Sequence, residues 1–159
     1  MAAEDIAFER LMALREGRRN DVYLDTLNKP TVGIGHLVVA GDKLKVGDVI
    51  TDAQVSAFFQ KDGAAAMSAA RSQAVEAGIS DTGFLPYLAS VNFQLGTAWT
   101  GTFPNTWKMI VDGRYEDAAQ ALALKVKASR ASPTPSTDRI MFLPVILRSA
   151  VWPALVVNV

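Results

Sequence analysis

The residue pattern changes twice within the first fifty or so positions, and this change limits the fold more than any other feature of the chain. Phe8, Leu11 and Met12 lie at i, i+3 and i+4, which is the spacing of one apolar face of a helix. We predict a helix over residues 3–16 that ends at Gly17. Residues 21–39 are instead rich in β-branched and aromatic residues, which predicts a small antiparallel sheet.

From Thr51 onward the pattern is helical again. Thr51 and Gln54 have the spacing of a capping box, in which each side chain bonds a free backbone N–H at the start of a helix. The apolar positions that follow extend this predicted helix to about residue 75. Further helices are predicted over residues 85–95, 104–111 and 115–127.

The predicted fold class is therefore α+β and mostly helical, without an internal repeat. A chain of 159 residues suits a single domain. We expect a small sheet lobe at about residues 17–50, packed on a helical lobe formed by residues 1–16 and 51–159.

Composition excludes several classes of function. Sixteen basic residues balance sixteen acidic ones, so the formal net charge is zero. Nucleic acid is therefore not expected as a partner, because phosphate binding depends on a basic surface. The chain has no cysteine and one histidine, which excludes disulfides and metal sites built on thiolates or several imidazoles. We expect no metal and no cofactor.

The N-terminal sequence does not have the pattern of a secretory signal. Glu4, Asp5 and Glu9 stand where such a signal needs basic and then apolar residues. The most apolar stretch, Ile140–Val159, is interrupted by Arg148 and two prolines and is not expected to span a membrane. It is expected to complete the helical core, and contact with a membrane is the less favoured alternative.

The sequence between the first helix and the predicted sheet holds two carboxylates and the only histidine. Glycosidases use such a pair, in which one carboxyl group acts as an acid while the other activates water or attacks the sugar. Glu16 at a helix end and Asp25 on the sheet suit these two roles. On spacing alone the simpler interpretation is two ordinary solvated acids, and a lone histidine is more often structural than catalytic.

The complete stretch EGRRNDVYLDTLNKPTVGIGH is more specific than its parts, because it resembles the signature of the bacteriophage-type lysozymes, glycoside hydrolase family 24. That signature has Glu-Gly, then Tyr-x-Asp, then Thr-x-Gly-x-Gly-His. The resemblance extends from Phe8 to about Leu124. It implies a lysozyme-like fold with the active cleft between the two lobes.

The resemblance also implies site residues. Glu16 would be the general acid, and Asp25 would be the base that positions a water with the help of Thr31. His36 would form a structural ion pair with Asp62. The positions that match sugar-binding ones are Leu37, Phe93, Gln94 and Thr106.

By the same resemblance, the chain would be an inverting muramidase that cleaves the bond between N-acetylmuramic acid and N-acetylglucosamine in peptidoglycan. It would be a monomeric phage endolysin, held in the host cytoplasm until a holin-type partner opens the membrane, and it would then act on the cell wall. Two alternatives remain: a wall-binding module without activity, and an endolysin with a membrane-active C-terminal segment.

Beyond Leu124 the sequence departs from the family pattern. The family has a Trp-x-x-Gln-Thr-Pro-like segment followed by an arginine, where this chain has SRASPTPSTDR. Thr134-Pro135 and Arg139 are the corresponding residues. An asparagine of the family is replaced near Ala121.

Overall fold

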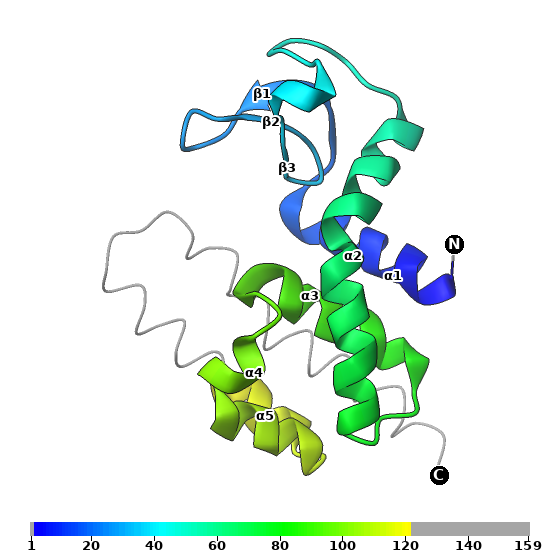
Figure 1. Ribbon diagram of the computed structural model, residues 1–159, viewed down its shortest axis with the longest axis vertical. Helices are drawn as coiled ribbons and strands as arrows, with labels where there is room; N and C mark the ends of the chain where they lie inside the picture. The colour runs from blue at the N-terminus through cyan, green and yellow to red at the C-terminus, as the bar shows by residue number, and fades with distance from the viewer. Residues whose placement is uncertain (1, 122–159) are drawn as a thin grey trace. The chain divides into compact units, whose positions relative to one another are not determined.

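The structure is a computed structural model that describes residues 2–121 of the chain (Figure 1). The chain forms two compact units, Met1–Ala64 and a second that begins at Ala65. The boundary lies inside the helix α2 (Asp52–Glu76). The predictions for Thr134-Pro135, Arg139 and Ile140–Val159 lie outside the described residues.

The first helix, α1 (Ala3–Glu16), has the predicted bounds. Phe8 and Met12, two of the three residues that define its apolar face, are buried. The helix ends at Gly17, whose φ of 80° lies in a region that side-chain-bearing residues rarely adopt. The glycine therefore allows the chain to leave α1 and turn directly into the first strand.

A three-stranded antiparallel sheet follows, formed by β1 (Arg19–Leu24), β2 (Pro30–Gly33) and β3 (His36–Leu37) in that order. The small antiparallel sheet predicted over residues 21–39 is confirmed, and its part after Pro30 is divided into two strands. The glycines explain the break: Gly33 and Gly35 have φ angles of 68° and 79°, and together they form the tight turn between β2 and β3.

The strand register separates two kinds of residue. Thr31 of β2 lies opposite Tyr23 of β1 and Leu37 of β3, so these three side chains share one face of the sheet. Val32 lies opposite His36, and both are buried on the other face. Thr31 and Leu37, which the resemblance assigns to catalysis and to sugar binding, therefore lie on the opposite face of the sheet from His36, the assigned structural histidine.

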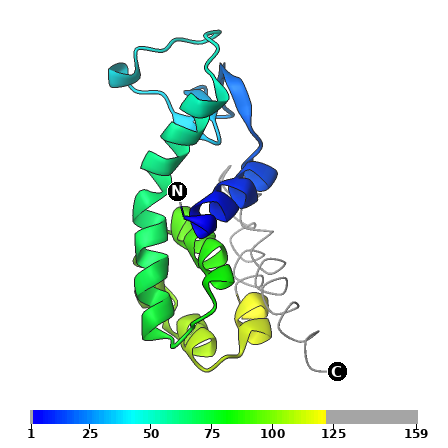
Figure 2. The same cartoon turned by 90° about the vertical axis from the view of Figure 1, so that its right-hand side faces the viewer.

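The longest described helix is α2, which has 25 residues (Figure 2). Its predicted capping box is confirmed, because Thr51 N donates to Gln54 Oε1 at 2.9 Å and Gln54 N donates to Thr51 Oγ1 at 3.2 Å. In the first unit α2 passes very close to α1. A Cβ atom at Gly63 would lie 2.9 Å from the ring of Phe8, so only glycine permits this approach.

The second unit contains α3 (Leu85–Leu95), α4 (Trp99–Thr102) and α5 (Pro104–Val111), and residues 115–121 are also helical. The bounds of α3 and α5 are as predicted, but α4 was not predicted. The core of the second unit includes a buried amide pair, in which Gln73 Nε2 donates to Asn92 Oδ1 and Asn92 Nδ2 donates to Gln73 Oε1. The pairing satisfies polar groups that would be costly to bury alone. Among residues 2–121, none of the helices has both the length and the apolar character needed to cross a bilayer.

Candidate active site

Glu16 is the last residue of α1 and is partly buried. The guanidinium of the preceding residue, Arg15, is also partly buried, and this burial lowers the pKa of Arg15. The negative charge of Glu16 acts in the opposite direction on that pKa. The two charges are therefore close enough to interact at the point where the chain leaves the helix.

Asp25 directly follows β1 and begins the turn to β2. One of its carboxylate oxygens, Oδ1, accepts hydrogen bonds from the backbone N–H groups of Leu27 at 2.8 Å and of Lys29 at 2.9 Å. Asn28 takes a left-handed conformation within this turn, with a φ of 60°. Within residues 2–121, no protein group bonds to the second oxygen, Oδ2. The turn thus holds the carboxylate by one oxygen and leaves the other for water.

Thr31 connects to the same turn. Its hydroxyl donates to the carbonyl of Lys29 at 3.2 Å, and that carbonyl also accepts the backbone N–H of Asp25. Thr31 is buried, with 5% of the residue exposed. Since the hydroxyl hydrogen is used toward Lys29, the lone pairs of Thr31 Oγ1 are what it can offer to a water.

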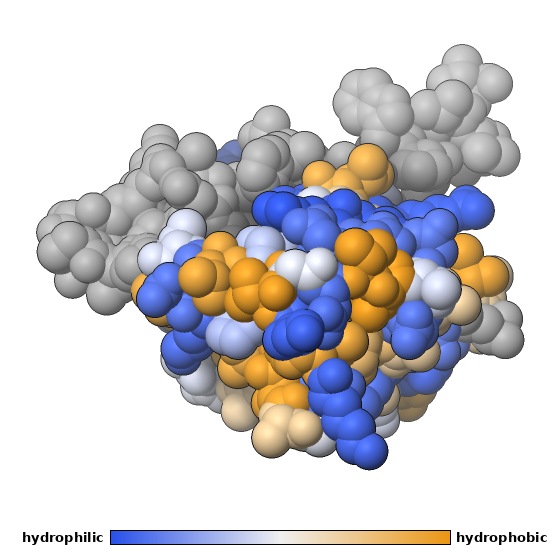
Figure 3. All heavy atoms as spheres, turned by 90° about the horizontal axis from the view of Figure 1, so that it is seen from above, coloured by the Kyte–Doolittle hydropathy of each residue, from blue (hydrophilic) through white to orange (hydrophobic). Residues whose placement is uncertain are grey.

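The four residues assigned to sugar binding differ in accessibility. Leu37 in the first unit is 46% exposed, which suits contact with a ligand. In the second unit, Phe93 and Gln94 at the end of α3 are partly exposed. Thr106 in α5 is buried, with 1% exposed, so it presents no surface to a ligand in this structure. Figure 3 views the sheet end of Figure 1 from above and shows apolar side chains interspersed with polar ones.

The chain matches the family described as Phage lysozyme over residues 13–134. The match covers well over half of the chain and includes Glu16, Asp25, Thr31 and His36. The chain belongs to the phage lysozyme family. Family membership indicates a muramidase-type glycosidase that hydrolyses peptidoglycan. The match continues ten residues beyond Leu124, where the resemblance was expected to end. Among curated proteins, no match to the chain was found.

The only histidine of this phage lysozyme lies between two carboxylates. His36 Nδ1 is 2.7 Å from Asp62 Oδ2, the partner that the resemblance assigned, and His36 Nε2 is 3.2 Å from Asp42 Oδ2. The imidazole also stacks on Phe58, with ring centres 4.1 Å apart. A neutral imidazole has a single N–H, so only the doubly protonated ring donates to both carboxylates. The arrangement therefore joins β3, α2 and the loop after β3 around one imidazole ring.

Asp42 is the member of this cluster that the sequence did not reveal. Its Oδ2 also accepts the backbone N–H of Val39 at 2.8 Å, which fixes the short 3-10 turn Ala40–Asp42. The Val39 N–H, then His36 and the charge of Lys61, hold the pKa of Asp42 below its ordinary value. The only hint in the sequence is the three-residue spacing from Val39 to Asp42, which is too common to single the residue out.

Replacing Asp42 by asparagine should lower the free energy of unfolding by about 1–3 kcal/mol at neutral pH, since a bond to a charged group is lost. The folded-state pKa of Asp42 is lowered, so its stabilising contribution is present above the unfolded value of about 4 and is lost as pH falls through the folded value. The difference between wild type and Asp42→Asn should therefore shrink below about pH 4. Urea unfolding at pH 7, 5 and 3.5 measures it.

Asp48 provides a matched control for this experiment. Its Oδ2 accepts the backbone N–H of Lys45 at 2.9 Å, with the same three-residue spacing, but no contact with His36 accompanies it. Asp48→Asn should cost less than Asp42→Asn at pH 7. Equal costs for the two variants would mean that the His36 contact contributes nothing to stability.

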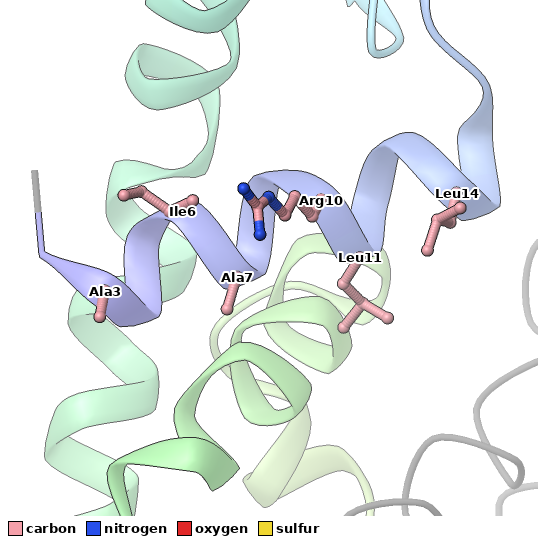
Figure 4. A pocket seen from close by; sticks show the side chains of 6 residues that line it. All are labelled: Ala3, Ile6, Ala7, Arg10, Leu11 and Leu14. Atoms are coloured by element: carbon pink, nitrogen blue, oxygen red, sulfur yellow. The ribbon is translucent and has the colours of Figure 1, made fainter.

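An open hollow of about 530 Å³ lies along α1, and it does not coincide with the candidate site. Neither carboxylate of the candidate pair lines it. Figure 4 shows its lining side chains, which are Ala3, Ile6, Ala7, Arg10, Leu11 and Leu14. With no acidic group in the lining, the hollow lacks the chemistry that glycoside hydrolysis requires.

Proposed function

We propose that this phage lysozyme cleaves the β-1,4 bond between N-acetylmuramic acid and N-acetylglucosamine, with Glu16 as general acid and Asp25 as general base. The observation that carries the proposal is the state of the Asp25 carboxylate. Two backbone N–H groups hold its Oδ1, and Oδ2 has no protein partner among residues 2–121. A base must be fixed in position and yet open to the water that it activates, and this arrangement meets both requirements.

Thr31 supports the same assignment. Its hydroxyl hydrogen is donated to the Lys29 carbonyl, which leaves oxygen lone pairs to accept a hydrogen from water. In the proposed step, one water donates its two hydrogens to Asp25 Oδ2 and Thr31 Oγ1. Its own lone pair then attacks the anomeric carbon while Glu16 protonates the leaving oxygen. One proton passes to Asp25, one leaves Glu16, and no covalent intermediate forms.

The stereochemistry of the product tests this mechanism. Attack by water on the far face of the sugar inverts the anomeric carbon, and it requires carboxyl groups about 6.5–9.5 Å apart. We expect the new N-acetylmuramic acid reducing end to appear first as the α-anomer. Proton NMR of fresh product, read before mutarotation, measures the anomer. An initial β-anomer would indicate a covalent intermediate on Asp25 and would rule out the water-holding role of Thr31.

The activity itself is tested on purified, insoluble peptidoglycan. We expect the suspension to clear and mass spectrometry to find muropeptides that end in reducing N-acetylmuramic acid. Leu37, Phe93 and Gln94 are the residues proposed to contact the glycan. Protein that sediments with the wall but releases no reducing ends would show a binding module and not a hydrolase.

We propose further that the enzyme serves as an endolysin, acting as a monomer. It would stay in the host cytoplasm until a holin-type partner permeabilises the membrane. The support is the match to a family of phage enzymes. Expression in a Gram-negative host should leave cells intact until a membrane-permeabilising agent is added, and lysis should then follow quickly. Lysis on expression alone, with no such agent, would contradict the need for a partner.

A further inference from the structure

An ion pair connects two segments of the first unit that flank Glu16. Arg18 Nη1 donates to Glu9 Oε1 at 2.9 Å, and Glu9 lies seven residues before Glu16 on the same helix. The Glu9 side chain is 13% exposed, and the same oxygen accepts the hydroxyl of Ser56 at 2.5 Å. This pair is thus partly removed from solvent, unlike an exposed surface pair that contributes little.

The other arm of the same guanidinium reaches the start of α2. Arg18 Nη2 donates to the carbonyl of Asp52 at 3.0 Å and lies 3.5 Å from its carboxylate. Asn20 adds to this connection, because its side-chain amide donates to the Ile50 carbonyl at 3.0 Å and to Asp52 Oδ1 at 2.9 Å. The beginning of β1 is therefore fixed to the first turn of α2.

Only Gly17 separates Glu16 from Arg18, and it has no heavy atom within 4 Å of where a Cβ would lie. Its φ of 80° is a conformation that glycine adopts and leaves easily. Packing at this residue therefore does not set the angle between the end of α1 and β1. The Arg18 guanidinium can set this angle, because Nη1 binds α1 through Glu9 and Nη2 binds α2 through Asp52.

We propose that Arg18 and Glu9 are positioning residues, which fix the direction of α1 at Gly17 and so hold the Glu16 carboxyl at its working distance from Asp25. The proposal rests on the catalytic roles proposed for Glu16 and Asp25. A shift of about 1 Å in a catalytic group can reduce the rate about a hundredfold. Arg18 and Glu9 touch neither the substrate nor the reacting atoms, and they act through the position of Glu16.

The central variant is Arg18→Met, which keeps roughly the length of the side chain and removes the hydrogen bonds to both Glu9 and Asp52. On soluble, uncrosslinked glycan strands we expect kcat to fall about ten- to hundredfold with KM within about twofold, because bound substrate meets a misplaced acid. Arg18→Lys keeps the charge and one bond to Glu9, so its kcat should lie between those of Arg18→Met and wild type. If Arg18→Met does not fold, Glu9→Gln tests the same pair, with the same expected split between kcat and KM.

Ser56→Ala is the matched control. It removes the second hydrogen bond to the same Glu9 oxygen and leaves the Arg18 bonds in place. We expect a small loss of thermal stability and a kcat within about twofold of wild type. Circular dichroism at the assay temperature verifies that each variant is folded.

Three results would overturn the proposal: wild-type kcat in folded Arg18→Met or Glu9→Gln, an increase in KM at constant kcat, or an equal loss of kcat in Ser56→Ala. Glu16→Gln, measured in parallel, separates this inference from the proposed function. If Glu16→Gln is inactive while Arg18→Met has full activity, only the positioning role fails. If Glu16→Gln retains activity, the catalytic assignment itself fails.

Discussion

Replacing Glu16 by glutamine should nearly abolish wall hydrolysis while leaving the protein folded. The amide has almost the shape of the acid but has no proton to give to the leaving oxygen. General acid catalysis is worth roughly 10²–10⁴-fold in rate, so we expect a loss of at least that size in kcat. Clearing of purified peptidoglycan by equal amounts of folded protein measures the loss.

A second glutamine substitution on the same helix controls for nonspecific effects. Glu4 lies in the first turn of α1, at the opposite end from Glu16. Glu4→Gln should clear peptidoglycan at close to the wild-type rate. If Glu16→Gln matches it, Glu16 is not the acid, and the proton donor has to be sought elsewhere in the chain.

Asp25→Asn should cause the second large loss, again about 10²–10⁴-fold in kcat, with little change in thermal stability. Asparagine retains the oxygen that accepts from Leu27 and Lys29, so the turn should form as before. The amide nitrogen then replaces Oδ2 and cannot take a proton from water. Kinetics on soluble glycan strands measure the loss of kcat, and thermal unfolding measures whether the stability has changed.

Asp25→Ala gives the complementary measurement. It removes both the base and the two hydrogen bonds to the turn, so it should reduce activity and also lower the melting temperature. Hydrolysis by Asp25→Asn at the wild-type rate would show that Oδ2 is not the base. If Asp25→Asn melts at a temperature as low as that of Asp25→Ala, the asparagine does not preserve the turn.

The helices were predictable because local chemistry determines their ends. Gly17 ends α1, the Thr51 and Gln54 box begins α2, and Pro104 occupies the first turn of α5, each by interactions within a few residues. The four-residue helix α4 was not predicted, because it spans about one turn and has no room for a periodic pattern. The strand break at Gly33 was also missed, because apolar residues continue on both sides of it.

Some residues of the candidate site and its surroundings could likewise be predicted from the sequence, and others could not. The resemblance supplied Glu16, Asp25, Thr31 and the pair His36–Asp62 because these positions belong to one motif or its partner helix. Asp42 was missed because its contact with His36 depends on how the loop after β3 folds back. The Glu9–Arg18 pair, nine residues apart, joins a helix to the residue before β1, and its spacing corresponds to no helix or strand period.

The position of His36 gives this chain a built-in spectroscopic reporter. With one histidine in 159 residues, the ring N–H signals of His36 cannot overlap with those of another side chain of the same type. Each ring nitrogen lies within hydrogen-bond distance of a carboxylate and the ring lies against Phe58, so a proton on either nitrogen should exchange with water slowly enough to be observed. Each signal reports a different neighbour: the Nδ1 proton reports the contact with α2, and the Nε2 proton reports the loop that carries Asp42. A single proton spectrum of any variant can thus show which of the two attachments has been lost.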